Sequence, residues 1–440
     1  MQVAIHTLGC KVNQYETAAL EGALRARGHG LVPFDGPADA YIINTCTVTA
    51  VSDKKSRQAV RQAKKRSPHA VVAVCGCYAQ TAPEAVEALG VDFIAGTADR
   101  MKFLDTLEDL MEKKRPQPTP PKAVCGVEDI MRQRTFEPLV ADGLEGRTRA
   151  MLKVEDGCTN FCSYCIIPYA RGPVRSLPLE GAVAQARRLA AEGYRELVLT
   201  GIELSSWGRD LPGRPEPIDL IEAVCAAAPD CRVRLGSLEP RTVTEEFCRR
   251  GARWENLCPH FHLSMQSGCD ATLARMNRKY DTKRYAQSVT LLRTFFDRPG
   301  ITTDLIVGFP GESEEEFSQT LAFLEQCAFT AMHIFPYSRR TGTPAASMPG
   351  QVPKAVKEER AHRAAQVAAR LEAAYLSTWV GESLPVLWEE EKDGLWRGHA
   401  PNYVEVRCPG VDLHNQLRQV HITAVEGGGL RGSIPEAGEA

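Results

Sequence analysis

The chain has 440 residues, enough for about three domains of roughly 150 residues each. Lys and Arg total 53 against 55 Asp and Glu, and this near balance excludes a histone-like protein that binds a polyanion through net charge. Apolar residues make up 43% and charged residues 25%, as in an ordinary globular chain. No apolar run approaches the roughly 18 residues of a membrane span, and the first residues do not resemble a secretory signal. We therefore expect a cytoplasmic protein whose fifteen cysteines stay reduced.

The first 115 residues alternate between apolar strand patterns and helical patterns. Strands are expected at residues 2–8, 40–44, 70–75 and 91–94, and helices at 13–27, 52–66, 83–89 and 101–114. Strands that alternate with helices favour a parallel sheet. Residues 1–115 are therefore predicted to form an α/β domain of the Rossmann or flavodoxin type.

Four prolines occur among residues 116–121, and we assign residues 116–146 to a linker. A second alternating block follows, with strands expected at 151–155, 197–200, 232–235, 261–264, 303–307 and 331–335. Six such units predict a partial (β/α)6 barrel over residues 147–375. Short strands separated by Gly and Pro then predict a small antiparallel β-barrel over residues 376–440.

Three cysteines lie close together just after the first strand of the second block. Cys158, Cys162 and Cys165 have the spacing Cys-x3-Cys-x2-Cys. Three thiolates in one loop can hold three irons of a [4Fe–4S] cluster and leave the fourth iron for a small ligand. A structural zinc site would need a fourth Cys or His, and none follows at the spacing of a zinc knuckle. The pattern therefore favours the iron–sulfur cluster.

Three further cysteines each follow a predicted strand of the first block. Cys10, Cys46 and Cys77 are separated by 35 and 30 intervening residues, about one βα unit each. Successive parallel strands end at one edge of a sheet, where ligands bind, so the spacing predicts a metal site there. Cys75 offers an alternative thiol, but it has the position of a buried strand residue, and Cys77 is preferred.

These motifs resemble the methylthiotransferase family of radical S-adenosylmethionine (SAM) enzymes over the whole chain. The resemblance rests on residues 7–16, 44–46 and 76–80 in the first block, and on residues 157–172 around the second cysteine group. The last segment resembles a TRAM domain. Residues 8–15 and 398–403 are most similar to the branch that acts on N6-threonylcarbamoyladenosine at tRNA position 37.

The resemblance implies two [4Fe–4S] clusters and SAM as both methyl donor and radical source. The cluster on Cys10, Cys46 and Cys77 would carry the inserted sulfur, and the cluster on Cys158, Cys162 and Cys165 would generate the radical that removes hydrogen from C2 of the adenine. The product is the 2-methylthio derivative. SAM-binding residues are expected at two strand ends, after residues 197–200 and 303–307. They are Thr200, Gly201, Glu203, Asp304, Gly308 and Glu312.

The implied substrate is a tRNA anticodon stem-loop, together with a sulfur donor and an electron donor that the sequence does not identify. We expect a monomer that does not bind membranes. A basic helix without acidic residues from 54 to 66 offers phosphate contacts, although a merely solvated helix face would look the same. Residues 376–440 hold 5 Lys and Arg but 10 Asp and Glu, so RNA contacts there are expected on one edge of the small barrel, through stacking and hydrogen bonds to base edges. The RNA-binding candidates are Lys54, Lys55, Arg57, Arg61, His399, Asn402, Tyr403 and Arg407.

Other functions remain open at this point. Within the family, the target is alternatively isopentenyladenosine in tRNA or an aspartate of a ribosomal protein. A two-cluster electron carrier without catalysis would cleave no SAM. RNA binding without chemistry would leave six regularly placed cysteines unexplained.

Overall fold

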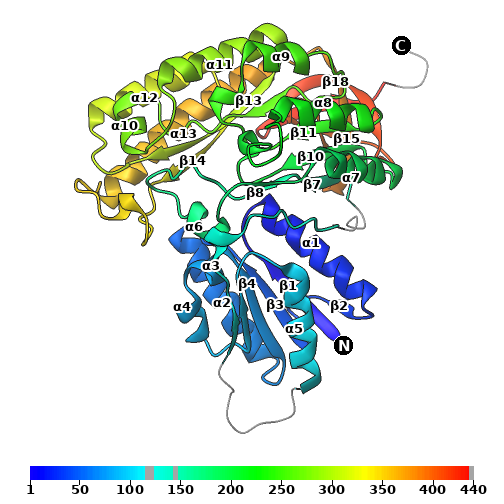
Figure 1. Cartoon of the computed structure of the whole chain (residues 1–440). Coiled ribbons are helices and arrows are strands. Elements are labelled where there is room, and N and C mark those ends of the chain that lie inside the picture. The colour runs from blue at the N-terminus through cyan, green and yellow to red at the C-terminus, as the bar shows by residue number, and fades with distance from the viewer. Residues whose placement is uncertain (114–122, 142–146, 436–440) are drawn as a thin grey trace. The chain divides into compact units, whose positions relative to one another are not determined.

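The computed structural model describes residues 1–113, 123–141 and 147–435 (Figure 1). The proline-rich segment at residues 116–121 lies outside the described residues. The chain forms two compact units. The first contains Met1–Leu144, Glu155–Leu177 and Ser338–Ala346, and the second contains Glu145–Val154, Pro178–Tyr337 and Ser347–Ala440. The first unit therefore joins the N-terminal region to the segment that carries Cys158, Cys162 and Cys165.

The first unit is built on a parallel six-stranded sheet, as the sequence predicts. Its strand order is β2-β1-β3-β4-β5-β6. The strands are β1 Gln2–Thr7, β2 Gly30–Val32, β3 Ala40–Thr45, β4 Val71–Gly76, β5 Phe93–Ala95 and β6 Val124–Gly126. Strand β2 was not anticipated, and β6 lies in the stretch that we assigned to the linker.

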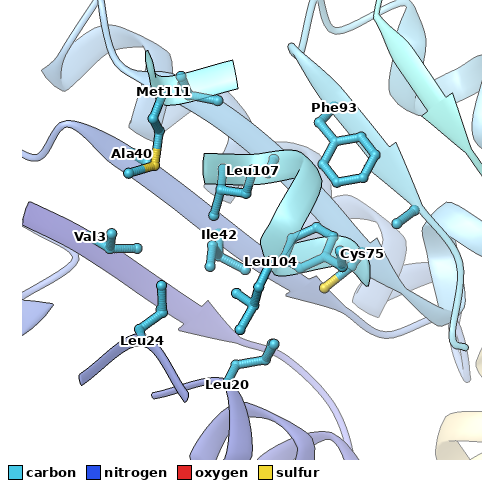
Figure 2. Packing of buried hydrophobic residues seen from close by; sticks show 14 residues of the cluster. Val3, Leu20, Leu24, Ala40, Ile42, Cys75, Phe93, Leu104, Leu107 and Met111 are labelled. Atoms are coloured by element: carbon cyan, nitrogen blue, oxygen red, sulfur yellow. The ribbon is translucent and has the colours of Figure 1, made fainter. Parts of the chain in front are cut away.

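Helices cover both faces of this sheet. Leu20 and Leu24 of α1 and Leu104 and Leu107 of α5 pack with Cys75 on one face (Figure 2). The other face packs against α2, α3 and α4. Neighbouring residues of a strand point to opposite faces, which is why the central strands are apolar throughout. The helices are α1 Lys11–Ala26, α2 Ala50–Arg66, α3 Cys77–Thr81, α4 Pro83–Glu87 and α5 Arg100–Lys113.

The remaining elements of the first unit are short. They are η1 Ile130–Arg132, β8 Glu155–Asp156, α6 Ile167–Arg171, β9 Arg175–Ser176 and η4 Pro344–Ala346. Strands β8 and β9 pair with each other and bracket the loop of Cys158, Cys162 and Cys165.

The second unit contains the predicted partial barrel. Two parallel three-stranded sheets, β11-β10-β7 and β12-β13-β14, are joined by a parallel bridge from Leu238 to Leu263. The strands are β7 Arg149–Lys153, β10 Glu196–Thr200, β11 Arg232–Leu235, β12 His260–His262, β13 Gly300–Val307 and β14 Ala331–Pro336. The helices are α7 Leu179–Ala191, η2 Leu204–Ser206, α8 Pro217–Ala227, η3 Pro240–Thr242, α9 Glu245–Gly251, α10 Asp270–Arg275, α11 Thr282–Phe295, α12 Glu314–Cys327 and α13 Lys354–Ser377. None of the helices in the described residues is both long and apolar enough to cross a membrane.

The end of the chain is a closed five-stranded barrel, which confirms the predicted β-barrel, although β17 and β19 pair in parallel and only the other four strand pairs are antiparallel. Its strands run in the order β15-β16-β17-β19-β18 around a core that contains Trp388 and Trp396. They are β15 Ser383–Lys392, β16 Leu395–His399, β17 Glu405–Cys408, β18 Leu417–Glu426 and β19 Gly429–Ser433.

A loop between β16 and β17 fastens this small barrel to the amino-terminal ends of the larger barrel's strands. The Tyr403 ring stacks on His260 at the start of β12, with ring centroids 4.7 Å apart. The Arg234 guanidinium lies 4.7 Å from the centre of the same ring and donates a 2.8 Å hydrogen bond to the Pro401 carbonyl oxygen. Glu196 is fully buried and accepts hydrogen bonds from both Arg232 and Arg234. Buried arginines therefore hold the loop in place.

Arg234→Ala should destabilise the whole chain. The substitution leaves the buried Glu196 carboxylate with one guanidinium fewer, and breaking a buried pair on one side costs about 3–5 kcal/mol. Arg298→Ala is the matched control, because its guanidinium also lies over an aromatic ring, that of Trp379, but is 37% exposed. Denaturant unfolding of the two full-length variants measures both costs. Equal free energies of unfolding would contradict the fastening role.

Candidate iron–sulfur and cofactor sites

The three early cysteines follow three adjacent strands of the parallel sheet. Cys10 caps the start of α1 after β1, Cys46 directly follows β3, and Cys77 is the first residue of α3 after β4. The strand order changes direction between β1 and β3, and such switch points form ligand-binding crevices at the carboxyl ends of strands. The sheet topology thus brings together residues that are far apart in sequence.

The side chains of these cysteines lie within electrostatic reach of one another. Burial raises the pKa of Cys77 to about 12, and the neighbouring Cys10 and Cys46 thiols raise it further, while the Arg171 guanidinium opposes the rise. Burial also raises the pKa of Cys46, and Cys10 adds to that rise. Cys46 and Cys77 are 6% and 4% exposed, and Cys10 is exposed. Because the raised pKa values keep the Cys46 and Cys77 thiols protonated at neutral pH, a metal must displace their protons when it binds.

Cys75 has different surroundings. Its side chain packs among Leu104, Leu107 and Phe93 in the core between the sheet and α5 (Figure 2). Neither Cys10 nor Cys46 is among the groups that perturb its pKa, which burial raises to about 11. The packing supports the preference for Cys77 over Cys75.

Two glycines permit the close approach of these loops. Gly9 has a φ of +113°, and a Cβ atom there would lie 2.9 Å from the Cys46 Cβ. Gly76 has a φ of +94°, and a Cβ atom there would lie 2.6 Å from the Thr45 carbonyl oxygen. Glycine is therefore required at both positions, for its backbone conformation and for its missing side chain.

A buried polar network lies directly behind Cys77. Arg171 donates from Nε to the Cys77 Sγ at 3.3 Å and from Nη2 to the Asn13 Oδ1 at 2.6 Å. Its guanidinium also binds Glu16, and Glu16 accepts a 2.8 Å bond from Arg100. All four polar residues are at most 1% exposed. Sequence reasoning missed this network because no local pattern marks arginines that become buried through long-range packing.

The loop of the second cysteine group is closed by backbone hydrogen bonds. The Cys158 amide donates to the Gly172 carbonyl at 3.0 Å, and the Cys165 amide donates to the Cys162 carbonyl at 2.9 Å. The Asn160 amide lies 3.5 Å from the Cys158 Sγ, where it can stabilise a thiolate. Cys162 is buried, whereas Cys158 and Cys165 are partly exposed, so the loop offers thiols that a cluster can reach.

The segment Ser338–Ala346 touches both cysteine loops within the first unit. The Arg340 guanidinium binds the Asp53 carboxylate and the Thr47 hydroxyl beside Cys46. The Ala345 amide donates a 2.8 Å hydrogen bond to the Ser163 carbonyl, between Cys162 and Cys165. This segment was not recognised from the sequence, because Arg340 is 287 positions from Asp53 and no motif links them.

The chemistry of the six thiols fits two cubane clusters. Among the residues that the structure describes, no group of three or more His, Cys, Asp or Glu side chains is arranged to hold a single metal ion. Each thiolate of a cubane binds a different iron, so its ligands are spread more widely than those of one ion. Each trio offers three thiols, which leaves one iron of a cubane without a protein thiolate.

The expected SAM-binding residues lie at the carboxyl ends of β10 and β13 in the second unit. Thr200 is 2% exposed, and its buried Oγ1 has no hydrogen-bond partner among the described residues, as expected where a polar ligand completes a site. Burial, together with the nearby Glu239 carboxylate, raises the pKa of Glu203 to about 7. Gly201 is partly exposed directly after Thr200. These three positions fit a cofactor that carries polar and cationic groups.

In the turn after β13, some of the polar groups are hydrogen-bonded to other groups of the protein. The Glu312 carboxylate accepts hydrogen bonds from the Gly308 amide at 2.6 Å and from Arg360 at 2.8 Å. Glu312 therefore closes its own turn, which differs from the expectation of a ligand-facing carboxylate. Gly308 has a φ of +69°, and Asp304 lies 3.3 Å from the ring nitrogen of His262.

The basic candidates for RNA binding lie on the outer face of α2. Lys54, Lys55 and Arg61 are exposed, and Arg57 is partly buried and hydrogen-bonds the Tyr78 hydroxyl at 3.1 Å. The first three therefore present their charges to solvent.

The four candidates in the terminal barrel do not form one exposed edge, which corrects the sequence-based expectation. Asn402 is 4% exposed and bonds the Tyr375 hydroxyl, and Tyr403 is stacked on His260. His399 stacks on Tyr403 and binds Glu389 at 2.6 Å. Arg407 is partly exposed and bonds Glu405. His399, Asn402 and Tyr403 therefore hold the two barrels of the second unit together.

Comparison with known protein families gives one family match for each of the two cysteine groups. Residues 2–96 match the family model described as Uncharacterized protein family UPF0004, and residues 152–324 match the Radical SAM superfamily. The chain is 41% identical over 427 residues to the threonylcarbamoyladenosine tRNA methylthiotransferase MtaB of Bacillus subtilis, covering 96% of this chain and 93% of that protein. It is 33% identical over 442 residues to a tRNA-2-methylthio-N(6)-dimethylallyladenosine synthase of Acetivibrio thermocellus, covering 98% and 90%.

A solved structure with a similar fold is the radical S-adenosylmethionine methyltransferase TsrM from Kitasatospora setae. Its TM-score is 0.57 at 17% identity, and the match covers 78% of this chain and 77% of that chain. At this identity the likeness concerns the fold alone. It agrees with the parallel sheet and the partial barrel described above.

Proposed function

Because the chain belongs to the tRNA methylthiotransferase family of radical SAM enzymes, we propose that it converts N6-threonylcarbamoyladenosine at tRNA position 37 to its 2-methylthio derivative. The observation that carries this proposal is the pair of cysteine trios within one compact unit. The choice of substrate is supported by the 41% identity to the Bacillus protein, against 33% to the dimethylallyladenosine synthase.

The six thiols would hold two [4Fe–4S] clusters, one on Cys10, Cys46 and Cys77 and the other on Cys158, Cys162 and Cys165. SAM bound at a reduced cluster supplies one-electron chemistry, which can act on a C–H bond that acids and bases cannot activate.

The chain's own residues would bind and orient the cofactor. Thr200 offers an unsatisfied hydroxyl, and Gly201 lets a ligand approach the backbone closely. The Glu203 carboxyl has a raised pKa, and a cationic amino group placed beside it would favour its charged form again. Asp304 and Gly308 would contribute from the second strand end, with Glu312 holding the turn in shape.

The tRNA is proposed to meet the exposed basic face of α2, directly after the Cys46 loop. Lys54, Lys55 and Arg61 can neutralise phosphates there. We further propose that the protein works in the cytoplasm as a monomer on the anticodon stem-loop. We also propose three domains, at residues 1–115, 147–375 and 376–440.

A second candidate is the methylthiolation of isopentenyladenosine, which the similarity to the Acetivibrio protein favours. Mass spectrometry of tRNA nucleosides from a strain that lacks this protein separates the two. We expect the methylthio group to disappear from threonylcarbamoyladenosine and to persist on isopentenyladenosine. The reverse pattern would establish the second candidate in place of the first.

Single cysteine substitutions should separate the two clusters. Cys158→Ala should abolish reductive cleavage of SAM, because it removes a ligand of the radical-generating cluster. Cys77→Ala should spare cleavage, stop thiolation and lower the iron content from about eight to about four per chain, since a cubane holds four irons. Cys75→Ala is the control and should keep all the iron. Loss of iron in Cys75→Ala but not in Cys77→Ala would reverse the ligand assignment.

Charge removal on α2 should weaken tRNA binding in a salt-dependent way. Each of Lys54→Ala, Lys55→Ala and Arg61→Ala should reduce the slope of log affinity against log salt by about 1, because each cation releases roughly one counterion. Lys113→Ala removes the same charge from α5 and serves as the control, since its side chain is 73% exposed. An unchanged slope in all three α2 variants would exclude this face.

A further inference from the structure

Arg171 follows the second cysteine group in sequence but contacts the first in space. It is the last residue of α6, six positions after Cys165. Its side chain is 0% exposed, and its Nε donates to the Cys77 Sγ at 3.3 Å. A residue from the radical-generating segment thus places a permanent positive charge against a thiol of the other trio.

The remaining nitrogens of this guanidinium are fixed by α1 and β8. Nη2 donates to the Asn13 Oδ1 at 2.6 Å and to Glu16 at 3.1 Å, and Nη1 binds Glu16 and lies 3.3 Å from Asp156. Five donors in one planar group can meet all these partners at once. A lysine carries the same charge but offers a single nitrogen, so it cannot reproduce the set.

A hydrogen bond from a cation to a cluster sulfur changes the cluster's redox properties. Reduction adds one electron and therefore one negative charge to the cluster and its thiolates. A donor aimed at a ligand sulfur stabilises that added charge, and hydrogen bonds to sulfur are among the features that set the potentials of such clusters. Burial strengthens the effect, because the surroundings screen the charge less than water does.

We propose that Arg171 positions Cys77 and raises the reduction potential of the cluster on Cys10, Cys46 and Cys77. This inference rests on the proposed two-cluster function, because it needs a cluster at that trio. It assigns Arg171 to the sulfur-carrying site, although its neighbours in sequence serve the other cluster.

The test uses full-length protein in two backgrounds that each retain one trio. The first carries Cys158→Ala, Cys162→Ala and Cys165→Ala, and the second carries Cys10→Ala, Cys46→Ala and Cys77→Ala. Each is reconstituted anaerobically with iron and sulfide, and a dithionite titration is followed by electron paramagnetic resonance. Arg171→Gln removes the positive charge, and Arg171→Lys retains the charge but lacks the planar group with five donors.

Arg175→Lys is the matched control. Arg175 is 3% exposed and lies in the same segment, but its nitrogens contact Asp156 and the carbonyl oxygens of Arg171 and Pro173. A general disturbance of the buried network would therefore affect this variant as well.

In the first background, Arg171→Gln should lower the ratio of reduced to oxidised cluster at least tenfold at a fixed solution potential, which corresponds to 59 mV for one electron. Arg171→Lys should give a smaller change in the same direction, and Arg175→Lys should give none. In the second background, Arg171→Gln should leave the potential unchanged.

An unchanged potential in Arg171→Gln with full iron would overturn the proposal, as would an equal shift in Arg175→Lys or a shift confined to the second background. If Arg171→Gln fails to hold iron, Arg171→Lys carries the test. Loss of iron in both Arg171 variants but not in Arg175→Lys supports the positioning role, and loss in all three contradicts it. The nucleoside analysis tests the proposed substrate separately. If the reduction potential shifts as expected but tRNA carries no methylthio product, the role of Arg171 stands and the proposed substrate is refuted.

Discussion

The buried ion pair between Glu16 and Arg171 attaches the second cysteine segment to helix α1 of the first unit. Both side chains are at most 1% exposed, and removal of one partner from such a pair costs about 3–5 kcal/mol. The Thr97 hydroxyl adds a 2.7 Å hydrogen bond to the Ala170 carbonyl in α6. These contacts explain why the segment Glu155–Leu177 belongs to the same compact unit as Cys10, Cys46 and Cys77.

This attachment also limits how far apart the two trios can be. From Cys165 to Arg171 the chain makes two steps of at most about 3.6 Å and four helical steps of about 1.5 Å, so their Cα atoms lie within about 13 Å. The Arg171 side chain then reaches the Cys77 Sγ. The proposed clusters are therefore neighbours, as an enzyme must arrange them if sulfur and radical are to meet at one base.

The sequence predicted the structure best where the positions of residues follow from the regular geometry of strands and helices. Cys10, Cys46 and Cys77 were predictable as a group because parallel strands end at one edge, and the partial barrel and terminal barrel followed from strand spacing. Three features were not predictable, because one is too short to show a sequence pattern and the other two depend on long-range packing. Strand β6 is too short to show a pattern, the partners of Arg171 come from distant elements, and the polar residues His399, Asn402 and Tyr403 looked like a surface but are packed against Arg234 and His260.

We propose that the two cysteine trios hold two neighbouring cubanes. The decisive measurement is the electron paramagnetic resonance spectrum of the fully reduced protein, compared with the summed spectra of the two variants that each retain one trio. Two neighbouring paramagnets broaden each other's signals, so we expect the wild-type spectrum to differ from the sum and to integrate to two spins per chain. A spectrum equal to the sum, or a single spin per chain, would contradict the proposal.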